Sequence, residues 1–112
     1  MIIKNSKVLK FISSFTSIHA IALYPFILIA DEGNEETINH ERIHIIQQKE
    51  LFIIGFYLLY ILFFVIGLLR YRSIFIAYSS IPFEREAYAN EDDWVYTLNR
   101  KRFAWRHYIS AS

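Results

Sequence analysis

Two segments of the chain, 11–30 and 51–69, contain no lysine, arginine, aspartate or glutamate. The second is apolar on every face of a helix. At about 1.5 Å per residue it would be about 28 Å long, close to the hydrocarbon thickness of a bilayer. Basic residues follow it, starting with Arg70. Because Gly55 favours a bend near the start of the segment, we expect an apolar helix over 56–70.

The polar segment between these two begins with acidic residues and has a lysine, Lys49, near its end. This distribution suits the helix dipole, whose positive end lies at the N-terminus. Ile38, Ile45 and Phe52 recur at the spacing of one helix face. The pattern therefore predicts a helix over 36–53, preceded by turn-forming residues.

The N-terminal region, 1–34, is open to three interpretations. Residues 1–22 resemble a signal peptide, because lysines precede an apolar stretch. Residues 11–30 are long enough for a transmembrane helix. We prefer one or two short extended segments over about 20–30, because Pro25 would interrupt a helix and the residues that follow it favour strands.

Composition narrows the fold class. The chain contains no cysteine, three glycines and two prolines, so disulfides and cysteine zinc clusters are excluded and turns must be few. Apolar residues make up 54% and aromatic residues 18%, which argues against disorder and against a nucleic-acid partner. We predict one mainly α domain over 1–112, with three or four helices and a short extended segment before the helix at 36–53.

The last part of the chain is basic and aromatic. A linking stretch, 73–82, is expected after the apolar helix, and Pro82 suits the first position of a further helix over 82–93. The tail, 94–112, has a composition that suits lipid headgroups. Basic, acidic, apolar and basic regions thus follow one another, and this order predicts a membrane-associated protein.

His40, Glu41 and His44 form the pattern H-E-x-x-H inside the predicted polar helix. Residues four apart lie one turn apart on the same face, so both imidazoles can reach one zinc ion. Glu41 can contact a zinc-bound water and act as the general base of hydrolysis. A chance match has a probability of about 1% for this composition. The alternative is two surface histidines on a polar helix face.

Zinc needs a third protein ligand, and the candidates are Glu84 and Glu86. On a helix these two side chains point about 200° apart, so only one can face the metal. Three further residues are candidates for contacts behind the ligands. Gln47 would act as a hydrogen-bond donor, Tyr88 through its hydroxyl or by packing, and Asn90 as a polar neighbour.

H-E-x-x-H on one helix, with a glutamate about 40 residues later in an E-x-x-A context, resembles the gluzincin metallopeptidases. The likeness is to the membrane-bound CAAX prenyl proteases and β-lactam-sensing receptors, and to ImmA/IrrE-type peptidases. The chain is also similar to short bacterial proteins with N-H-E-x-I-H-x-x-Q-Q followed by P-F-E-x-E-A-Y. In the peptidases the first glutamate of the downstream motif is the third zinc ligand. The E-x-E-A pattern favours Glu84 over Glu86, although Tyr88 then stands where Asp or Asn is usual.

The resemblance implies a zinc metallopeptidase of the bacterial inner membrane that acts on peptides, with Zn²⁺ held by His40, His44 and Glu84. Two alternatives stay open. One is a non-catalytic subunit of a larger membrane complex, in which the motif is structural or vestigial. The other is a structural membrane protein without a metal.

The position of the apolar segment restricts its relation to the membrane. If 51–69 crossed a bilayer and the chain stayed on the far side, the histidines and Glu84 would lie in different compartments. They could not then share an ion. We therefore expect a monotopic or re-entrant arrangement, in which the outer face of the apolar helix lies in the membrane interface and lipid is a partner.

Overall fold

The computed structural model describes residues 2–14 and 19–109, without the side chain of Ile12. Its elements in chain order are β1 (Ile2–Ile3), α1 (Lys7–Ser13), β2 (Ala20–Leu23), β3 (Phe26–Ile29), α2 (Glu35–Glu50), α3 (Ile54–Tyr71), α4 (Ile74–Ser80), α5 (Pro82–Asn90), α6 (Tyr96–Asn99) and a 3₁₀ helix, η1 (Ala104–Tyr108). The predicted mainly helical fold, with extended structure before the H-E-x-x-H helix, is confirmed. The described residues form six α-helices rather than three or four, because α1, α4 and α6 were not expected.

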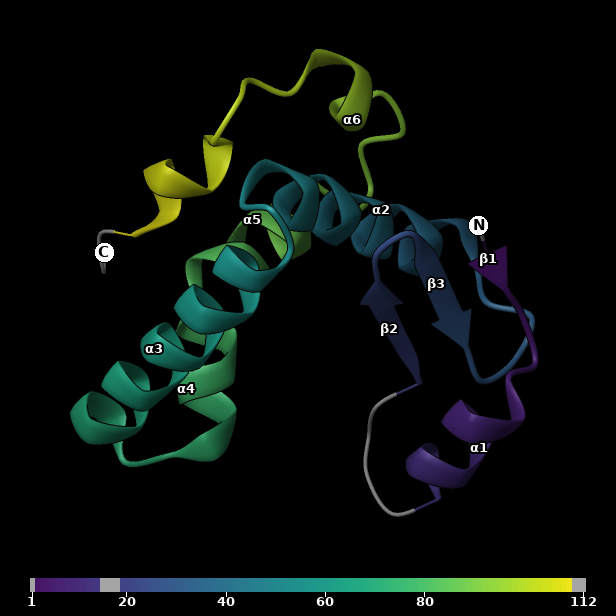
Figure 1. Ribbon diagram of the computed structural model, residues 1–112, viewed down its shortest axis with the longest axis horizontal. Helices are drawn as coiled ribbons and strands as arrows, with labels where there is room; N and C mark the ends of the chain where they lie inside the picture. The colour runs from purple at the N-terminus through teal and green to yellow at the C-terminus, as the bar shows by residue number, and fades with distance from the viewer. Residues whose placement is uncertain (1, 15–18, 110–112) are drawn as a thin grey trace.

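Helix α2 lies across the top of an arch, with α3 and α4 on one side and the sheet and α1 on the other (Figure 1). The sheet has the order β1-β3-β2. Strands β2 and β3 are antiparallel, with Ala20 opposite Ile29, and β1 runs parallel to β3. Ile27 and Ile29 are buried. The extended segment predicted over 20–30 is thus confirmed, and a transmembrane helix over 11–30 is not formed.

Helix α2 is capped at its start by Asn34, whose side-chain oxygen accepts a hydrogen bond from a backbone N–H of the first turn. It ends at Glu50, three residues before the predicted end. Phe52 and Ile53 have left-handed backbone, with φ of 57° and 68°, and they turn the chain into α3. The bend predicted near Gly55 therefore exists but lies two to three residues earlier, and Gly55 itself lies inside α3.

The stretch predicted as a linker over 73–82 is largely helical. Ser73 caps α4 by accepting a hydrogen bond from the backbone N–H of Ile76. Helix α4 packs along α3, so the chain turns back toward α2 (Figure 1). The two helices approach closely at Gly67, where a Cβ atom would lie 2.9 Å from the Cα of Ala77. The hairpin of α3 and α4 thus depends on the missing side chain of Gly67.

Replacing Gly67 with alanine is expected to lower the free energy of unfolding by about 1–3 kcal/mol, because the new methyl group would force α3 and α4 apart. Gly55→Ala is the matched control. Its Cβ would meet the Cβ of Leu51 at an ordinary 3.4 Å, and alanine favours a helix over glycine by up to about 1 kcal/mol. Chemical denaturation measures both changes, and equal stabilities of the two variants would contradict the close packing.

The C-terminal segment packs on α5. Asn90 ends this helix three residues earlier than predicted, and its amide donates to the Glu86 carbonyl oxygen at 2.8 Å and to the Tyr108 hydroxyl at 3.1 Å. Trp105 is buried, with its ring centroid 5.0 Å from that of Phe83. The prediction that the tail lies among lipid headgroups is thus wrong for Trp105, because its ring packs in the hydrophobic core.

Candidate metal centre

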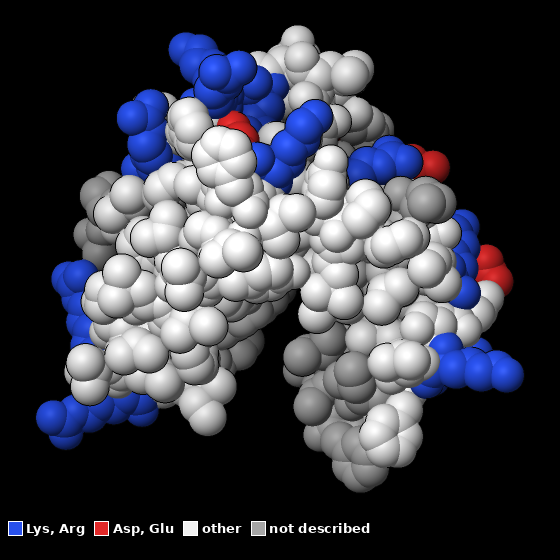
Figure 2. Space-filling view, viewed as in Figure 1, with Lys and Arg blue, Asp and Glu red and all other residues white. Residues whose placement is uncertain are grey.

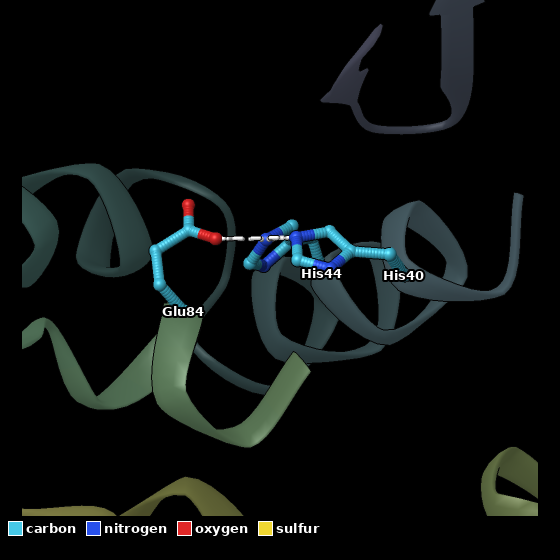
Figure 3. Close-up of side chains that lie close together, drawn as sticks. All are labelled: His40, His44 and Glu84. Atoms are coloured by element: carbon cyan, nitrogen blue, oxygen red, sulfur yellow. Dashed lines mark hydrogen bonds and ion pairs between the residues drawn. The ribbon is translucent and has the colours of Figure 1, made fainter. Parts of the chain in front are cut away.

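Two histidines and a glutamate converge between α2 and α5 (Figure 3). His40 and His44 lie one turn apart on α2, and Glu84 lies in the first turn of α5. The Oε1 atom of Glu84 is 3.2 Å from His40 Nε2 and 3.0 Å from His44 Nε2, and the two Nε2 atoms are 3.1 Å apart. All three residues are buried. The structure thus brings both predicted histidines together with the first of the two predicted glutamates.

The triangle formed by these three atoms has the size that a small metal ion requires. A tetrahedral zinc ion, with ligands at about 2.0–2.1 Å, holds its ligand atoms about 3.3 Å from one another. The three observed separations lie between 3.0 and 3.2 Å. Small side-chain movements would therefore suffice for coordination, and this buried group could hold a metal ion.

The second nitrogen of each imidazole faces an oxygen. His44 Nδ1 is 2.7 Å from Gln47 Oε1, and His40 Nδ1 is 2.9 Å from Glu91 Oε2. Because each oxygen accepts a hydrogen bond, the network assigns the proton of the neutral ring to Nδ1. When both rings are neutral, each Nε2 therefore directs its lone pair toward the shared position, as in metal sites whose histidines are oriented by an outer carboxylate or amide.

Further hydrogen bonds fix the groups behind the ligands. The Gln47 side-chain nitrogen donates to the Phe83 carbonyl oxygen at 3.1 Å and to Glu86 Oε1 at 2.9 Å, so its oxygen must face His44. Gln47 is thus a hydrogen-bond acceptor toward the ligand, not only the predicted donor. The Tyr60 hydroxyl, from α3, donates to Oε2 of Glu84 at 2.6 Å. That contact leaves Oε1 as the atom of Glu84 that faces the histidines.

Glu86, the other predicted candidate, faces away from the histidines. It is fully buried, and its carboxylate accepts hydrogen bonds from Arg100 and, at 2.7 Å, from Tyr96. Arg100 also pairs with both carboxylate oxygens of Glu50 at the end of α2, at 2.7 and 3.0 Å. Glu86 therefore links α5 to α2 and the C-terminal segment, and it lies outside the group of three ligands.

Glu41 lies beside the ligands, with its Oε2 atom 3.9 Å from His40 Nε2. Burial raises the pKa of its carboxyl group, and the nearby histidines offset this effect only in part. Glu41 and the three ligands line a cavity of about 230 Å³, whose other walls are strand β2, Gln48 and four aromatic side chains: Phe56, Tyr57, Tyr60 and Tyr78. The surface is hollowed between the two sides of the arch (Figure 2).

The structure gives Tyr88 and Asn90 different positions. The ring of Tyr88 packs edge-on against His40, with 4.5 Å between centroids, and its hydroxyl lies 3.1 Å from that of Tyr78. Tyr78 lines the cavity. Asn90, the last residue of α5, donates to the Glu86 carbonyl oxygen and to the Tyr108 hydroxyl. The packing alternative for Tyr88 thus agrees with the structure, whereas the hydrogen bonds of Asn90 are directed away from the ligands.

The protonation of His44 couples to metal binding. Burial lowers the pKa of His44, but the Glu84 carboxylate outweighs burial and raises it to about 9. Burial would raise the pKa of Glu84, but the charge of His44 and hydrogen bonds from His40, His44 and Tyr60 hold it well below its usual range. At neutral pH, His44 of the metal-free protein therefore carries a proton that a metal ion must displace.

Binding of one zinc ion at pH 7.5 is accordingly expected to release close to one proton from His44, in addition to any proton that a zinc-bound water loses. A histidine with an ordinary pKa near 6.5 would release only about a tenth of a proton at this pH. Because the pKa lies above the working pH, zinc affinity should also rise with pH up to about 9. Calorimetric titrations in buffers of different ionisation enthalpy count the protons, and zinc binding without proton release would contradict the arrangement of His44 and Glu84.

Several residues that hold the ligands were not identified in the sequence. Tyr60 lies in the apolar run, where its hydroxyl was the only available signal, and Glu91 and Arg100 contact their partners across long stretches of chain. Asn39, directly before the motif, donates to the backbone oxygens of Glu91 at 2.9 Å and Asp93 at 3.0 Å. It thereby holds the turn that carries Glu91.

Taken together, these side chains form a buried site of two histidines and one carboxylate, built on two helices, with a second glutamate at the edge of an adjoining cavity. Comparison with models of protein families, with curated proteins and with solved structures finds no match to the chain. Two histidines with one glutamate is one of the ligand sets of catalytic zinc, in which the remaining coordination position holds water or substrate.

Proposed function

We propose that the protein is a membrane-associated zinc peptidase of the gluzincin type, with His40, His44 and Glu84 as ligands and Glu41 as the general base. One observation supports this more than any other. The Nε2 atoms of two histidines and one carboxylate oxygen lie within 3.2 Å of one another, next to a cavity that Glu41 also lines. A purely structural metal site would not need that cavity.

Zinc is the ion that best fits these donors. Nitrogen and carboxylate oxygen ligands at tetrahedral spacing suit zinc, whereas magnesium and calcium prefer six or more oxygen ligands. When bound, zinc would lower the pKa of a water molecule toward about 7 and polarise a substrate carbonyl. The cavity that adjoins the three side chains would have room for that water.

Glu41 moves the proton in this reaction. Its buried carboxylate takes a proton from the attacking water as the hydroxyl oxygen bonds to the carbonyl carbon of the peptide. It then donates that proton to the amide nitrogen as the C–N bond breaks, which yields one carboxylic acid and one amine, ionised at neutral pH as a carboxylate and an ammonium group. In the metal-free site, burial raises the pKa of Glu41, which makes its carboxyl group a stronger base than an exposed glutamate.

The edge of strand β2 borders the cavity and offers a place for the peptide backbone. The backbone N–H of Ala30 donates to the His19 oxygen at 2.8 Å. In the alternating antiparallel ladder, the backbone groups of Ile21 then point toward β3, and those of Ala20 and Ala22 point away from it. An extended peptide would pair through its main chain with this edge, which no other strand of the described residues covers.

Membrane association is supported by the outer face of α3. This helix is the one in the described part of the chain that is long and apolar enough to cross a bilayer, and only 11% of it is buried. Exposed aliphatic side chains line it: Ile54, Leu58, Ile61, Leu62, Val65, Ile66 and Leu69. The side of the molecule seen in Figure 2 is largely uncharged, with basic residues at its margins.

The α3–α4 hairpin returns the chain to α5, so His40 and Glu84 lie on the same side of any bilayer that α3 contacts. Insertion of the outer face of α3 into the interface of a bacterial inner membrane fits this geometry. Flotation of the purified protein with lipid vesicles tests it. Protein that stays soluble without detergent and does not float would contradict membrane association.

Zinc-dependent hydrolysis is the direct test of the proposed function. Purified protein should contain close to one equivalent of zinc, hydrolyse peptides, and lose hydrolysis on chelation and regain it when zinc is restored. Protein that binds zinc without hydrolysing any peptide would support the non-catalytic subunit instead. Metal-free protein of normal stability would contradict both metal-binding proposals.

A further inference from the structure

We infer that the site takes short peptides with an apolar side chain, and that Gln48 sets the length limit by closing the edge of strand β2. This inference rests on the proposed peptidase function and specifies the substrate class of the same site. Gln48 is thus a residue that determines specificity for substrate length. It is not a metal ligand and takes no part in proton transfer.

The side chain of Gln48 occupies the place of a neighbouring strand. Its nitrogen donates to the Ala22 carbonyl oxygen at 2.8 Å, and its oxygen accepts from the Tyr24 backbone N–H at 2.8 Å. The first group lies on the side of β2 that faces away from β3, and the second belongs to the turn residue directly after β2; an added strand would otherwise use both. The Gln48 side chain is buried, at 1% exposure, so an incoming peptide could use these two backbone groups only by displacing the Gln48 amide from them.

Within the described residues, the part of the β2 edge that Gln48 leaves open is short. At Ala20 both the N–H and the C=O point away from β3, and at Ala22 only the N–H lacks the contact with Gln48. A bound peptide can therefore pair at Ala20 and reach Ala22, but it cannot continue toward Tyr24. Pairing with β2 thus ends within about one residue pair on that side of the cavity.

The cavity indicates which side chain is accepted. Its volume of about 230 Å³ is below the range of about 300–1,000 Å³ typical of sites for drug-sized ligands. Phe56, Tyr57, Tyr60 and Tyr78 supply an aromatic wall, and the charged side chains among the described lining residues all belong to the metal site. A charged substrate side chain would lose its hydration without a free partner, so an apolar one is favoured.

These two features together define the substrate class. The sheet edge holds a short extended backbone, and the aromatic wall accommodates one apolar side chain beside the metal ligands. A peptide extended past Gln48 must either leave the edge or break both hydrogen bonds of the Gln48 amide. Extension at one end of the peptide should therefore reduce hydrolysis much more than extension at the other.

The test compares the zinc-loaded wild type with Gln48→Ala on peptides lengthened one residue at a time, first at one end and then at the other. For the wild type, kcat/KM should fall about tenfold or more beyond a few residues at one end only. Replacing the apolar residue next to the cleaved bond with lysine or aspartate should reduce it by a similar factor. In Gln48→Ala, the ratio of kcat/KM for long over short peptides should rise about tenfold.

Two further variants keep the experiment decisive. Lys49→Ala changes the exposed neighbour of Gln48 on α2 and should keep the wild-type length limit. Gln48→Glu retains the acceptor for Tyr24 and loses the donor to Ala22, so it should give an intermediate ratio if Gln48→Ala fails to fold. Equal hydrolysis of peptides extended at both ends, or a length limit that Gln48 variants do not change, would overturn the inference alone. Absence of hydrolysis of every peptide would overturn the proposed function and this inference with it.

Discussion

Glutamine in place of Glu41 is expected to leave the metal site loaded and to lower peptide hydrolysis by about 10²–10⁴-fold. The side chain lies outside the ligand group, with its Oε2 atom 3.9 Å from His40 Nε2. Glutamine has nearly the same size, so the cavity should keep its shape, but its amide cannot take the proton of the attacking water. Zinc content and kcat/KM measured on one preparation separate the loss of the base from a loss of metal.

Glu36→Gln is the matched control, because Glu36 also lies on α2 but is exposed. Its hydrolysis should equal that of the wild type. Full activity of Glu41→Gln would contradict the assignment of Glu41 as the base. If Glu41→Gln also has no effect in the cell while zinc is bound, the motif is better explained as the structural site of a membrane subunit.

Alanine in place of His44 is expected to abolish stoichiometric zinc binding. It removes one of the three side chains of the buried group, and two would remain. At a free zinc concentration of about 1,000 times Kd, a bound ion raises the free energy of unfolding by about 4 kcal/mol. The variant should lose this whole increment. Denaturation with and without added zinc measures the loss, and metal analysis of the purified protein measures the stoichiometry.

His107→Ala is the control for this change, because His107 is exposed and lies outside the ligand group. It should bind zinc and be stabilised by it like the wild type. Glu84→Gln tests the third ligand with little change in volume and should also weaken zinc binding. An unchanged zinc stabilisation of His44→Ala would place the bound metal elsewhere.

The ligand helices could be predicted from the sequence because their signals are local. Four-residue spacing puts His40 and His44 on one face of a helix. Glu84 and Glu86 point about 200° apart on theirs, so they cannot both face one ion. The structure places Glu84 with the histidines. The choice between the two glutamates depends on a tertiary contact. Arg100, fourteen residues further along the chain, donates to the Glu86 carboxylate and holds it away from the histidines. No periodicity within the helix carries that information.

Other features were missed because they contradict local preference. The bend after α2 occurs at Phe52 and Ile53, two residues for which left-handed backbone is unfavourable, while Gly55 close by is helical. Helix α4 lies in a stretch whose apolar residues lack a helical period, and its formation depends on packing against Gly67. The sequence does not distinguish Tyr60 from its apolar neighbours, because its role depends on the hydrogen bond to Glu84, which is distant in the sequence.

One guanidinium group connects the two helices that supply the ligands. Arg100 pairs with Glu50 of α2 and with Glu86 of α5, yet it belongs to neither helix. The two helices, which Gln47 also joins directly, are therefore held together in part by a segment that contributes no donor atom to the candidate metal site. Heating that detaches this segment should widen the coordination sphere before either helix unwinds. The dissociation rate of a bound zinc ion would then measure how stably the segment that contains Arg100 packs against the two helices.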